Sequence, residues 1–158
     1  MELYRRENYL KKIRGFYHDS EMIKVITGVR RCGKSSLMQT IIEELKEQGV
    51  PEANLVFLDL DSKKHKSIKK PEQLEQEIDK LCSAEGMKYL FIDEIQNIIG
   101  FEEIINAYRG EKEYSVFITG SNSYLLSGEL ITKLTGRYIE IEMLPLSFEE
   151  YIDMKQYY

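Results

Sequence analysis

The segment Gly28-Val-Arg-Arg-Cys-Gly-Lys-Ser35 constrains the fold of this chain more than any other feature of the sequence. It has the spacing G-x-x-x-x-G-K-S, between an apolar strand pattern at 23–27 and an amphipathic helix pattern at 34–48. In such a loop the glycines let the backbone curl until successive N–H groups point inward. Together with the free N–H groups at the start of the helix, these donors bind phosphate oxygens. The sequence therefore predicts a strand–loop–helix unit that binds a phosphorylated ligand.

The side chains of the loop are expected to have different roles. Lys34 would reach the β- and γ-phosphates of a nucleotide, and the Ser35 hydroxyl would ligate Mg²⁺. Arg30 and Arg31 either add positive charge near the nucleotide or a neighbouring subunit, or project into solvent. The expected nucleotide-binding set is Gly28, Val29, Arg30, Arg31, Cys32, Gly33, Lys34, Ser35 and Ser36, with Ser121 from a later segment.

A second pattern, Tyr89-Leu-Phe-Ile-Asp-Glu94, is an apolar strand that ends in two adjacent carboxylates. In open α/β sheets ligands bind at the carboxyl ends of the strands, so both carboxylates are expected to face the phosphate loop. Asp93 suits the shell of a Mg²⁺ ion, usually through water. Glu94 is placed to orient and deprotonate an attacking water. Such a pair also occurs after strands without any function, but the phosphate loop upstream favours the catalytic interpretation.

Two further segments carry candidates for contact with the γ-phosphate. Val116-Phe-Ile-Thr-Gly-Ser-Asn122 is an apolar strand pattern with a polar end. Its Ser121 and Asn122 either touch the γ-phosphate or the attacking water, or cap the next helix. Arg137 either stabilises transition-state charge from a neighbouring subunit or pairs on the surface with a carboxylate such as Glu140. The predicted catalytic residues are thus Lys34, Glu94, Asn122 and Arg137, and the predicted metal ligands are Ser35 and Asp93.

Strand and helix patterns alternate along most of the chain, which predicts an α/β fold with a parallel sheet and helices on both faces. Besides the unit around the loop, strands are expected at 55–60, 89–93, 115–119 and 138–144, and helices between Pro71 and Gly86, around 101–108, over 123–135 and from Ser147. Four strands are nearly continuous apolar runs, as burial on both faces requires. The strand at 138–144 alternates apolar and acidic residues, so it is expected at an edge. The basic, aromatic segment 1–18 is expected to pack as a helix beside the first strand.

Composition and charge limit the classes of partner. The 158 residues are 42% hydrophobic and 31% charged, which is an ordinary globular composition. The net charge of −5 disfavours a surface that coats nucleic acid, although the basic loop 61–70 either contacts nucleic acid or is simply solvated. The N-terminus shows no signal-peptide pattern, and no apolar run approaches the roughly 18 residues of a membrane span. Membrane insertion is therefore not expected.

The two cysteines and two histidines show no zinc-ligand spacing. Two thiols without a disulfide framework predict a reducing compartment, which is the cytoplasm here. Cys32, beside Lys34 and a helix N-terminus, is either a readily ionised thiol that makes ATP binding sensitive to oxidation, or a small residue that the loop tolerates.

Four features of the sequence, in this order, resemble the AAA-type branch of the P-loop ATPases: the phosphate loop, the acidic pair, the strand pattern 116–122 and Arg137. The stretches 26–35, 90–97, 117–123 and 134–151 are similar to a bacterial and archaeal family of AAA-family ATP-binding proteins. The resemblance implies a three-layer P-loop core with a five-stranded parallel sheet in the order 5-1-4-3-2. It also implies Mg-ATP as ligand, the loop as a Walker A motif, Asp93-Glu94 as a Walker B motif, and Arg137 as the candidate arginine finger.

Members of that family look like proteins of several hundred residues with a C-terminal domain. On this comparison, 1–158 is expected to be the ATPase domain alone, with 1–18 as the N-terminal helix, 19–145 as the core and 146–158 as the start of the C-terminal region. Three functions remain open: an ATPase, an ATP-dependent switch with slow hydrolysis, and a small-molecule kinase. The kinase is weaker because the acidic pair suits water activation. A GTPase is weaker again because Thr132-Lys-Leu-Thr135 lacks the Asp of a guanine-reading motif.

Overall fold

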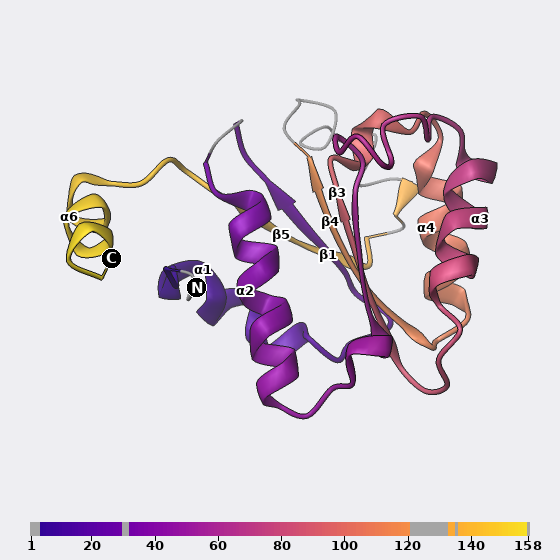
Figure 1. Cartoon of the computed structure of the whole chain (residues 1–158), viewed down its shortest axis with the longest axis horizontal. Helices are drawn as coiled ribbons and strands as arrows, with labels where there is room; N and C mark the ends of the chain where they lie inside the picture. The colour runs from indigo at the N-terminus through magenta and orange to yellow at the C-terminus, as the bar shows by residue number, and fades with distance from the viewer. Residues whose placement is uncertain (1–3, 30–31, 121–132, 135, 158) are drawn as a thin grey trace.

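The strands that surround the phosphate loop form a parallel sheet in the computed structural model, which describes residues 4–29, 32–120, 133–134 and 136–157 (Figure 1). Within these residues the order is β2-β3-β4-β1-β5, and every neighbouring pair runs parallel. This is the predicted order 5-1-4-3-2 read from the other side. The strands are β1 (Ile23–Thr27), β2 (Leu55–Asp59), β3 (Lys88–Asp93), β4 (Tyr114–Gly120) and β5 (Tyr138–Glu142).

Helices cover both faces of the sheet, as a parallel sheet with apolar strands requires (Figure 1). One apolar cluster joins the sheet to α1 (Glu7–Ile13) and α2 (Lys34–Glu47), and the other joins it to α3 (Pro71–Leu81) and α4 (Phe101–Gly110). The last helix, α6 (Phe148–Tyr157), lies away from the sheet, next to the N-terminal segment. Short 3₁₀ helices are η1 (Arg14–Phe16), η2 (Glu52–Asn54) and η3 (Ile95–Asn97). The helices expected over 123–135 fall almost wholly outside the described residues.

The three central strands are buried along their whole length, whereas the two edge strands are not. In β5 the acidic side chains of Glu140 and Glu142 are exposed and Ile141 is buried, so the predicted edge strand with one wet face is confirmed. The second strand was expected to be buried on both faces, and this is wrong for one face. Leu55 and Phe57 are only half-buried, because β2 is the other edge of the sheet.

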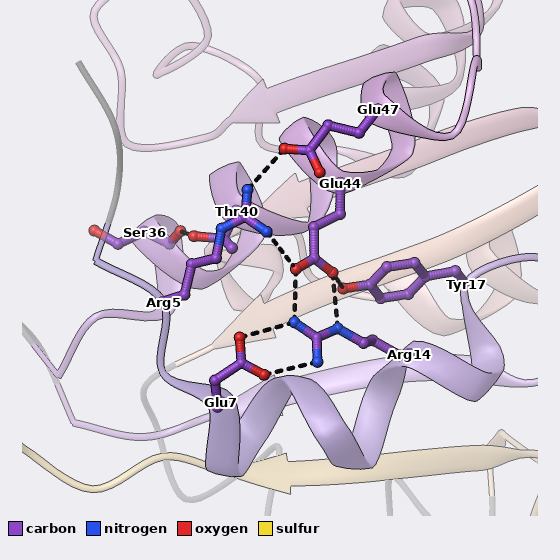
Figure 2. Close-up of polar contacts among 8 residues, drawn as sticks. All are labelled: Arg5, Glu7, Arg14, Tyr17, Ser36, Thr40, Glu44 and Glu47. Atoms are coloured by element: carbon purple, nitrogen blue, oxygen red, sulfur yellow. Dashed lines mark hydrogen bonds and ion pairs between the residues drawn. The ribbon is translucent and has the colours of Figure 1, made fainter.

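The N-terminal segment is α-helical only over Glu7–Ile13, a shorter stretch than predicted, and it is fixed to α2 by a group of ion pairs centred on Glu44 (Figure 2). Arg14 donates to both carboxylate oxygens of Glu44, at 3.0 and 2.7 Å, and Arg5 donates to one of them at 3.0 Å. The hydroxyl of Tyr17 adds a fourth hydrogen bond at 2.7 Å. The hydrogen bonds from Arg14 are the largest cause that holds the pKa of Glu44 below its ordinary value. The carboxylate is therefore a charged anchor between the N-terminal segment and the helix that follows the phosphate loop.

No helix in the described part of the chain is both long enough and apolar enough to cross a bilayer.

A lysine in the central strand β1 was not anticipated as a buried group. Lys24 is fully buried, and its ammonium donates to the carbonyl of Asp19 at 2.5 Å and to the hydroxyl of Ser115 at 2.8 Å. The ammonium also lies 4.8 Å from the centre of the Phe117 ring. Burial lowers the pKa of Lys24 to about 7. The folded chain therefore releases this proton at a much lower pH than the unfolded chain.

The Lys24→Met substitution tests this buried amine. Between about pH 7 and the ordinary lysine pKa of 10.5, the unfolded chain binds one more proton at this position than the folded chain. The contribution of Lys24 to the free energy of unfolding should therefore rise with pH in that interval, by about 1 kcal/mol per pH unit. Urea titrations at several pH values should show that the free energy of unfolding of the wild type, relative to that of Lys24→Met, rises by that amount. Lys80→Met removes an exposed lysine of α3 and should give a constant difference. A constant difference for Lys24→Met would contradict the assignment.

Candidate functional site

The carboxyl ends of β1, β3 and β4 meet at one edge of the sheet, and the phosphate loop and the acidic pair lie together there. The loop follows Thr27 at the end of β1, and Asp93-Glu94 ends β3. Gly120 ends β4 at the same edge, and Ser121, Asn122, Arg30 and Arg31 lie outside the described part of the chain. Because β4 separates β1 from β3, the order of strands predicted for this edge is confirmed.

The phosphate loop depends on its two glycines. Gly28 has a φ of +152°, and a Cβ there would lie 2.6 Å from the Cys32 sulfur and 2.7 Å from the backbone oxygen of Met143. Gly33, directly before α2, has a φ of +101°, in the left-handed region that favours glycine. Cys32 is buried in the apolar cluster of α1 and α2, where solution oxidants have little access to its thiol. The redox role of Cys32 therefore stays a prediction. The close packing around Gly28 requires a glycine at that position.

The side chain of Lys34 is folded back onto its own loop. Its ammonium donates to the carbonyl oxygen of Gly28 at 2.8 Å and to that of Val29 at 3.0 Å, and the residue is 5% exposed. A phosphate in the loop would compete with these two carbonyls for the same ammonium. Lys34 is thus held at the site, with acceptors that an anionic ligand can replace.

Asp93 joins the loop helix to the sheet. Its carboxylate is 2% exposed and accepts hydrogen bonds from the Ser35 hydroxyl on one oxygen and the Thr119 hydroxyl on the other. Ser35 is itself exposed, at the first turn of α2. The two predicted metal ligands therefore lie in direct contact, with one of them open to solvent.

Glu94 has a backbone conformation that is unusual for its residue type. Its φ of 62° and ψ of 48° place it in the left-handed region, where strained residues often mark functional sites. Its amide donates to the Thr119 hydroxyl at 3.0 Å, and its carboxylate accepts a hydrogen bond of 2.5 Å from the Gln96 amide. Thr119 from β4 therefore holds the backbone of Glu94, and Gln96 from η3 contacts its carboxylate.

Arg137 does not lie at this edge of the sheet. The register pairs Ile23, the first residue of β1, with Tyr138, so Arg137 is at the amino end of β5. Its side chain is exposed, and its backbone carbonyl accepts hydrogen bonds from the Ile23 amide and the Arg109 guanidinium. Five residues of extended strand separate the two edges, roughly 15–20 Å. Within one chain, Arg137 is therefore remote from the phosphate loop.

Three residues that sequence reasoning did not assign contribute to the site. Thr119 bonds Asp93 and Glu94, Gln96 bonds Glu94, and Arg6 donates to the Cys32 carbonyl of the loop at 2.7 Å. The local sequence did contain two signals: a threonine in an apolar strand, and a glutamine two residues after Glu94. Arg6 had no local signal, because its partner lies far along the chain.

The donors at the site fit a magnesium ion and a nucleotide. The Ser35 hydroxyl and the Asp93 carboxylate are hard oxygen ligands, which Mg²⁺ prefers, and Mg²⁺ commonly takes one or two carboxylates and completes its shell with water and phosphate. Among the described residues no group of three His, Cys, Asp or Glu side chains could enclose a metal.

The sequence profile described as "AAA domain" matches residues 20–152. An uncharacterized protein of Haemophilus influenzae is 43% identical over 151 residues, which are 95% of this chain and 38% of that protein. An uncharacterized protein of Methanocaldococcus jannaschii is 34% identical over 136 residues, which are 85% of this chain and 29% of that protein. The chain thus spans well under half the length of both relatives.

Solved structures share the fold at low sequence identity. Hsp104 of S. cerevisiae in its ADP complex has a TM-score of 0.71 and 17% identity, over 99% of this chain and 24% of that chain. A DNA replication initiation factor has a TM-score of 0.62 and 17% identity, over 95% of this chain and 48% of that chain. PCH-2 of C. elegans has a TM-score of 0.62 and 16% identity, over 92% of this chain and 45% of that chain. These likenesses show the fold.

Replacing Gly28 with alanine tests the close packing of the loop. The new Cβ would overlap a backbone oxygen that cannot rotate away, so Gly28→Ala should lower the free energy of unfolding by about 2–4 kcal/mol. Gly110→Ala is the matched control, because a Cβ there meets nothing within 4 Å. Urea unfolding of the control should show no loss, and a gain of a few tenths of a kcal/mol would fit the reduced entropy of the unfolded chain. Equal stability of the two variants would show that the loop at Gly28 is not packed as described.

Proposed function

This chain belongs to the AAA domain family, and from that premise we propose that it binds ATP with Mg²⁺ and hydrolyses it. The observation that carries the proposal is the contact between Ser35, the last residue of a complete phosphate loop, and the buried carboxylate of Asp93. That contact brings together the phosphate-binding and the metal-binding halves of a nucleotide site. Two motifs that are remote in sequence therefore act on one ligand.

In this proposal the loop amides and Lys34 bind the phosphates. Lys34 exchanges the carbonyls of Gly28 and Val29 for β- and γ-phosphate oxygens, so its charge moves from the loop backbone to the ligand. Ser35 and Asp93 would hold Mg²⁺, which when bound neutralises negative charge on the phosphates. Binding and charge neutralisation supply most of what phosphoryl transfer needs.

Glu94 acts as the general base in this proposal. Glu94 directly follows Asp93 at the carboxyl end of β3, and in this proposal a water in line with the γ-phosphate lies within reach of its carboxylate. Glu94 accepts a proton from that water, and the Gln96 amide orients the carboxylate. Ser121 and Asn122, outside the described residues, are proposed to contact the γ-phosphate or the water.

A nucleotide-dependent switch with slow turnover is the second candidate. The arrangement of Lys34 favours it, because the ammonium of this residue is bound to two carbonyls of its own loop. These contacts must break before Lys34 can bind phosphate, so they would favour a resting state. A switch of this kind would act through a partner molecule. Lysines of the loop 61–70, at the carboxyl end of β2, are exposed, and contact between this loop and nucleic acid stays a prediction from the sequence.

The substitution Glu94→Gln separates the two candidates. If Glu94 is the base, phosphate release from Mg-ATP should fall by about 100-fold or more, because the amide cannot accept the proton. Binding of a fluorescent ATP analogue should be retained, since Glu94 is not a phosphate ligand. Glu103→Gln changes an exposed carboxylate in α4 and should keep both activities. Unchanged turnover in Glu94→Gln would rule out Glu94 as base, and binding without turnover in the wild type would favour the switch.

Arg137 is proposed to act on the site of a neighbouring copy, because in its own chain it lies at the opposite edge of the sheet. The specific rate of ATP hydrolysis should then rise with protein concentration. Arg137→Met should bind ATP without turnover, and Lys34→Met should fail to bind the phosphates. A mixture of these two inactive variants should recover activity, because the Lys34→Met copy supplies Arg137 to an intact loop. A flat rate with concentration and no recovery in the mixture would show that Arg137 has no such role.

A further inference from the structure

Arg6 is a buried arginine that touches the phosphate loop from outside. It is 7% exposed, and its guanidinium lies 4.7 Å from the centre of the Tyr9 ring. One nitrogen donates to the Cys32 carbonyl at 2.7 Å, and another donates to the Leu144 carbonyl at 2.9 Å. A Cβ added to Gly33 would come within 3.5 Å of the guanidinium, so Arg6 lies directly against the loop backbone.

The loop needs such a donor because of its own geometry. When the amides of a loop point inward at an anion, the carbonyls of the same peptides point outward. A carbonyl that is buried on the outer side must find a donor in the protein. Lys34 serves the carbonyls of Gly28 and Val29, but it must leave them to bind phosphate. Arg6 donates to the carbonyl of Cys32 and does not have to bind the phosphates, so this hydrogen bond can remain when the ligand is bound.

The same guanidinium is bound to the start of α6. Two nitrogens of Arg6 donate to the two oxygens of Glu150, at 3.0 and 3.1 Å. Glu150 also accepts a hydrogen bond of 3.1 Å from the Ser147 amide, and its own amide donates to the Ser147 hydroxyl at 3.2 Å, so the two residues form a capping box. The carboxylate that begins α6 therefore fixes the guanidinium that supports the loop.

Two further hydrogen bonds strengthen this connection. The Leu144 amide donates to the Tyr9 hydroxyl at 2.9 Å, and the Tyr4 hydroxyl donates to Asp153 of α6 at 3.0 Å. The N-terminal segment thus lies between α6 and the loop, and contacts both. Movement of α6 relative to this segment would change the position of Arg6.

We propose that Arg6 is a positioning residue that supports the phosphate loop, and that Glu150 couples α6 to nucleotide affinity through Arg6. Displacement of α6, by a partner or by a neighbouring part of a longer protein, would release the guanidinium and weaken ATP binding. The proposal rests on the proposed function, since nucleotide binding is the output that it controls. It makes α6 a regulatory element of the site.

A double-mutant cycle measures this coupling. Affinity for a fluorescent ATP analogue is measured in wild type, Arg6→Met, Glu150→Gln and the double variant. Arg6→Met should weaken binding by about tenfold, because a charge-assisted hydrogen bond to the loop is lost. Glu150→Gln should weaken binding by about threefold, although Glu150 does not touch the loop. The double variant should bind like Arg6→Met alone, because Glu150 acts through Arg6. Independent, additive effects would overturn the coupling.

Arg14→Met is the matched control for these variants. Arg14 also fixes the N-terminal segment to α2, through Glu44, but its bonds are remote from the loop. It should lower the midpoint of unfolding and leave nucleotide affinity unchanged. If Arg6→Met behaves in the same way, Arg6 is only structural and the proposal is wrong. Where Arg6→Met fails to fold, Arg6→Lys and the single variant Glu150→Gln carry the same comparison, since both keep an intact loop sequence.

Hydrogen exchange without nucleotide separates this inference from the proposed function. The amides of residues 32–35 should exchange faster in Arg6→Met and Glu150→Gln than in wild type, and at the wild-type rate in Arg14→Met. If the wild-type chain does not bind the ATP analogue, the proposed function falls, while faster exchange would still support the role of Arg6 on the loop. Unchanged exchange in both variants would overturn that role, whatever the affinity measurements show.

Discussion

The buried carboxylate of Asp93 is the group on which the architecture of the site depends. A charged group that is 2% exposed is tolerated only when hydrogen bonds replace the lost water. The two donors come from different elements: Ser35 from the first turn of α2 and Thr119 from β4. The Thr119 hydroxyl also accepts a hydrogen bond from the amide of Glu94, the residue after Asp93, and so fixes its backbone. The cost of burying one charge is therefore offset by contacts that place the loop helix, two strands and the second carboxylate relative to one another.

The N-terminal segment contributes to the same arrangement from the far side of α2. This helix begins at the loop with Lys34 and carries Glu44 near its other end. Arg6 contacts the loop, while Arg14 contacts Glu44. Ion pairs at the surface contribute little individually, but Glu44 is buried and accepts several donors at once. The segment thus braces both ends of one helix, with the buried side chains of Leu10 and Ile13 between them.

The local motifs and the alternation of elements could be predicted from the sequence, because each depends on residues close together in the chain. The loop from Gly28 to Ser35 and the strand that ends in Asp93 are of this kind. The order of the strands came from resemblance, since periodicity does not say which strands are neighbours. Arg6 could not be assigned, because its acceptors lie in the loop and in α6, and one of them, Glu150, is 144 residues away. Lys24 was missed for the same reason: its burial depends on Ser115 of another strand.

The exposed edge of β5 limits how copies of this chain can associate. Its neighbour on one side is β1, and the other side has no strand among the described residues. Glu140 and Glu142 project from the same face of that strand into solvent. If two copies joined along this edge in a continuous sheet, their acidic side chains would stand opposite one another, and like charges so placed repel. The β5 edge is thereby protected against sheet extension by a second copy of the chain.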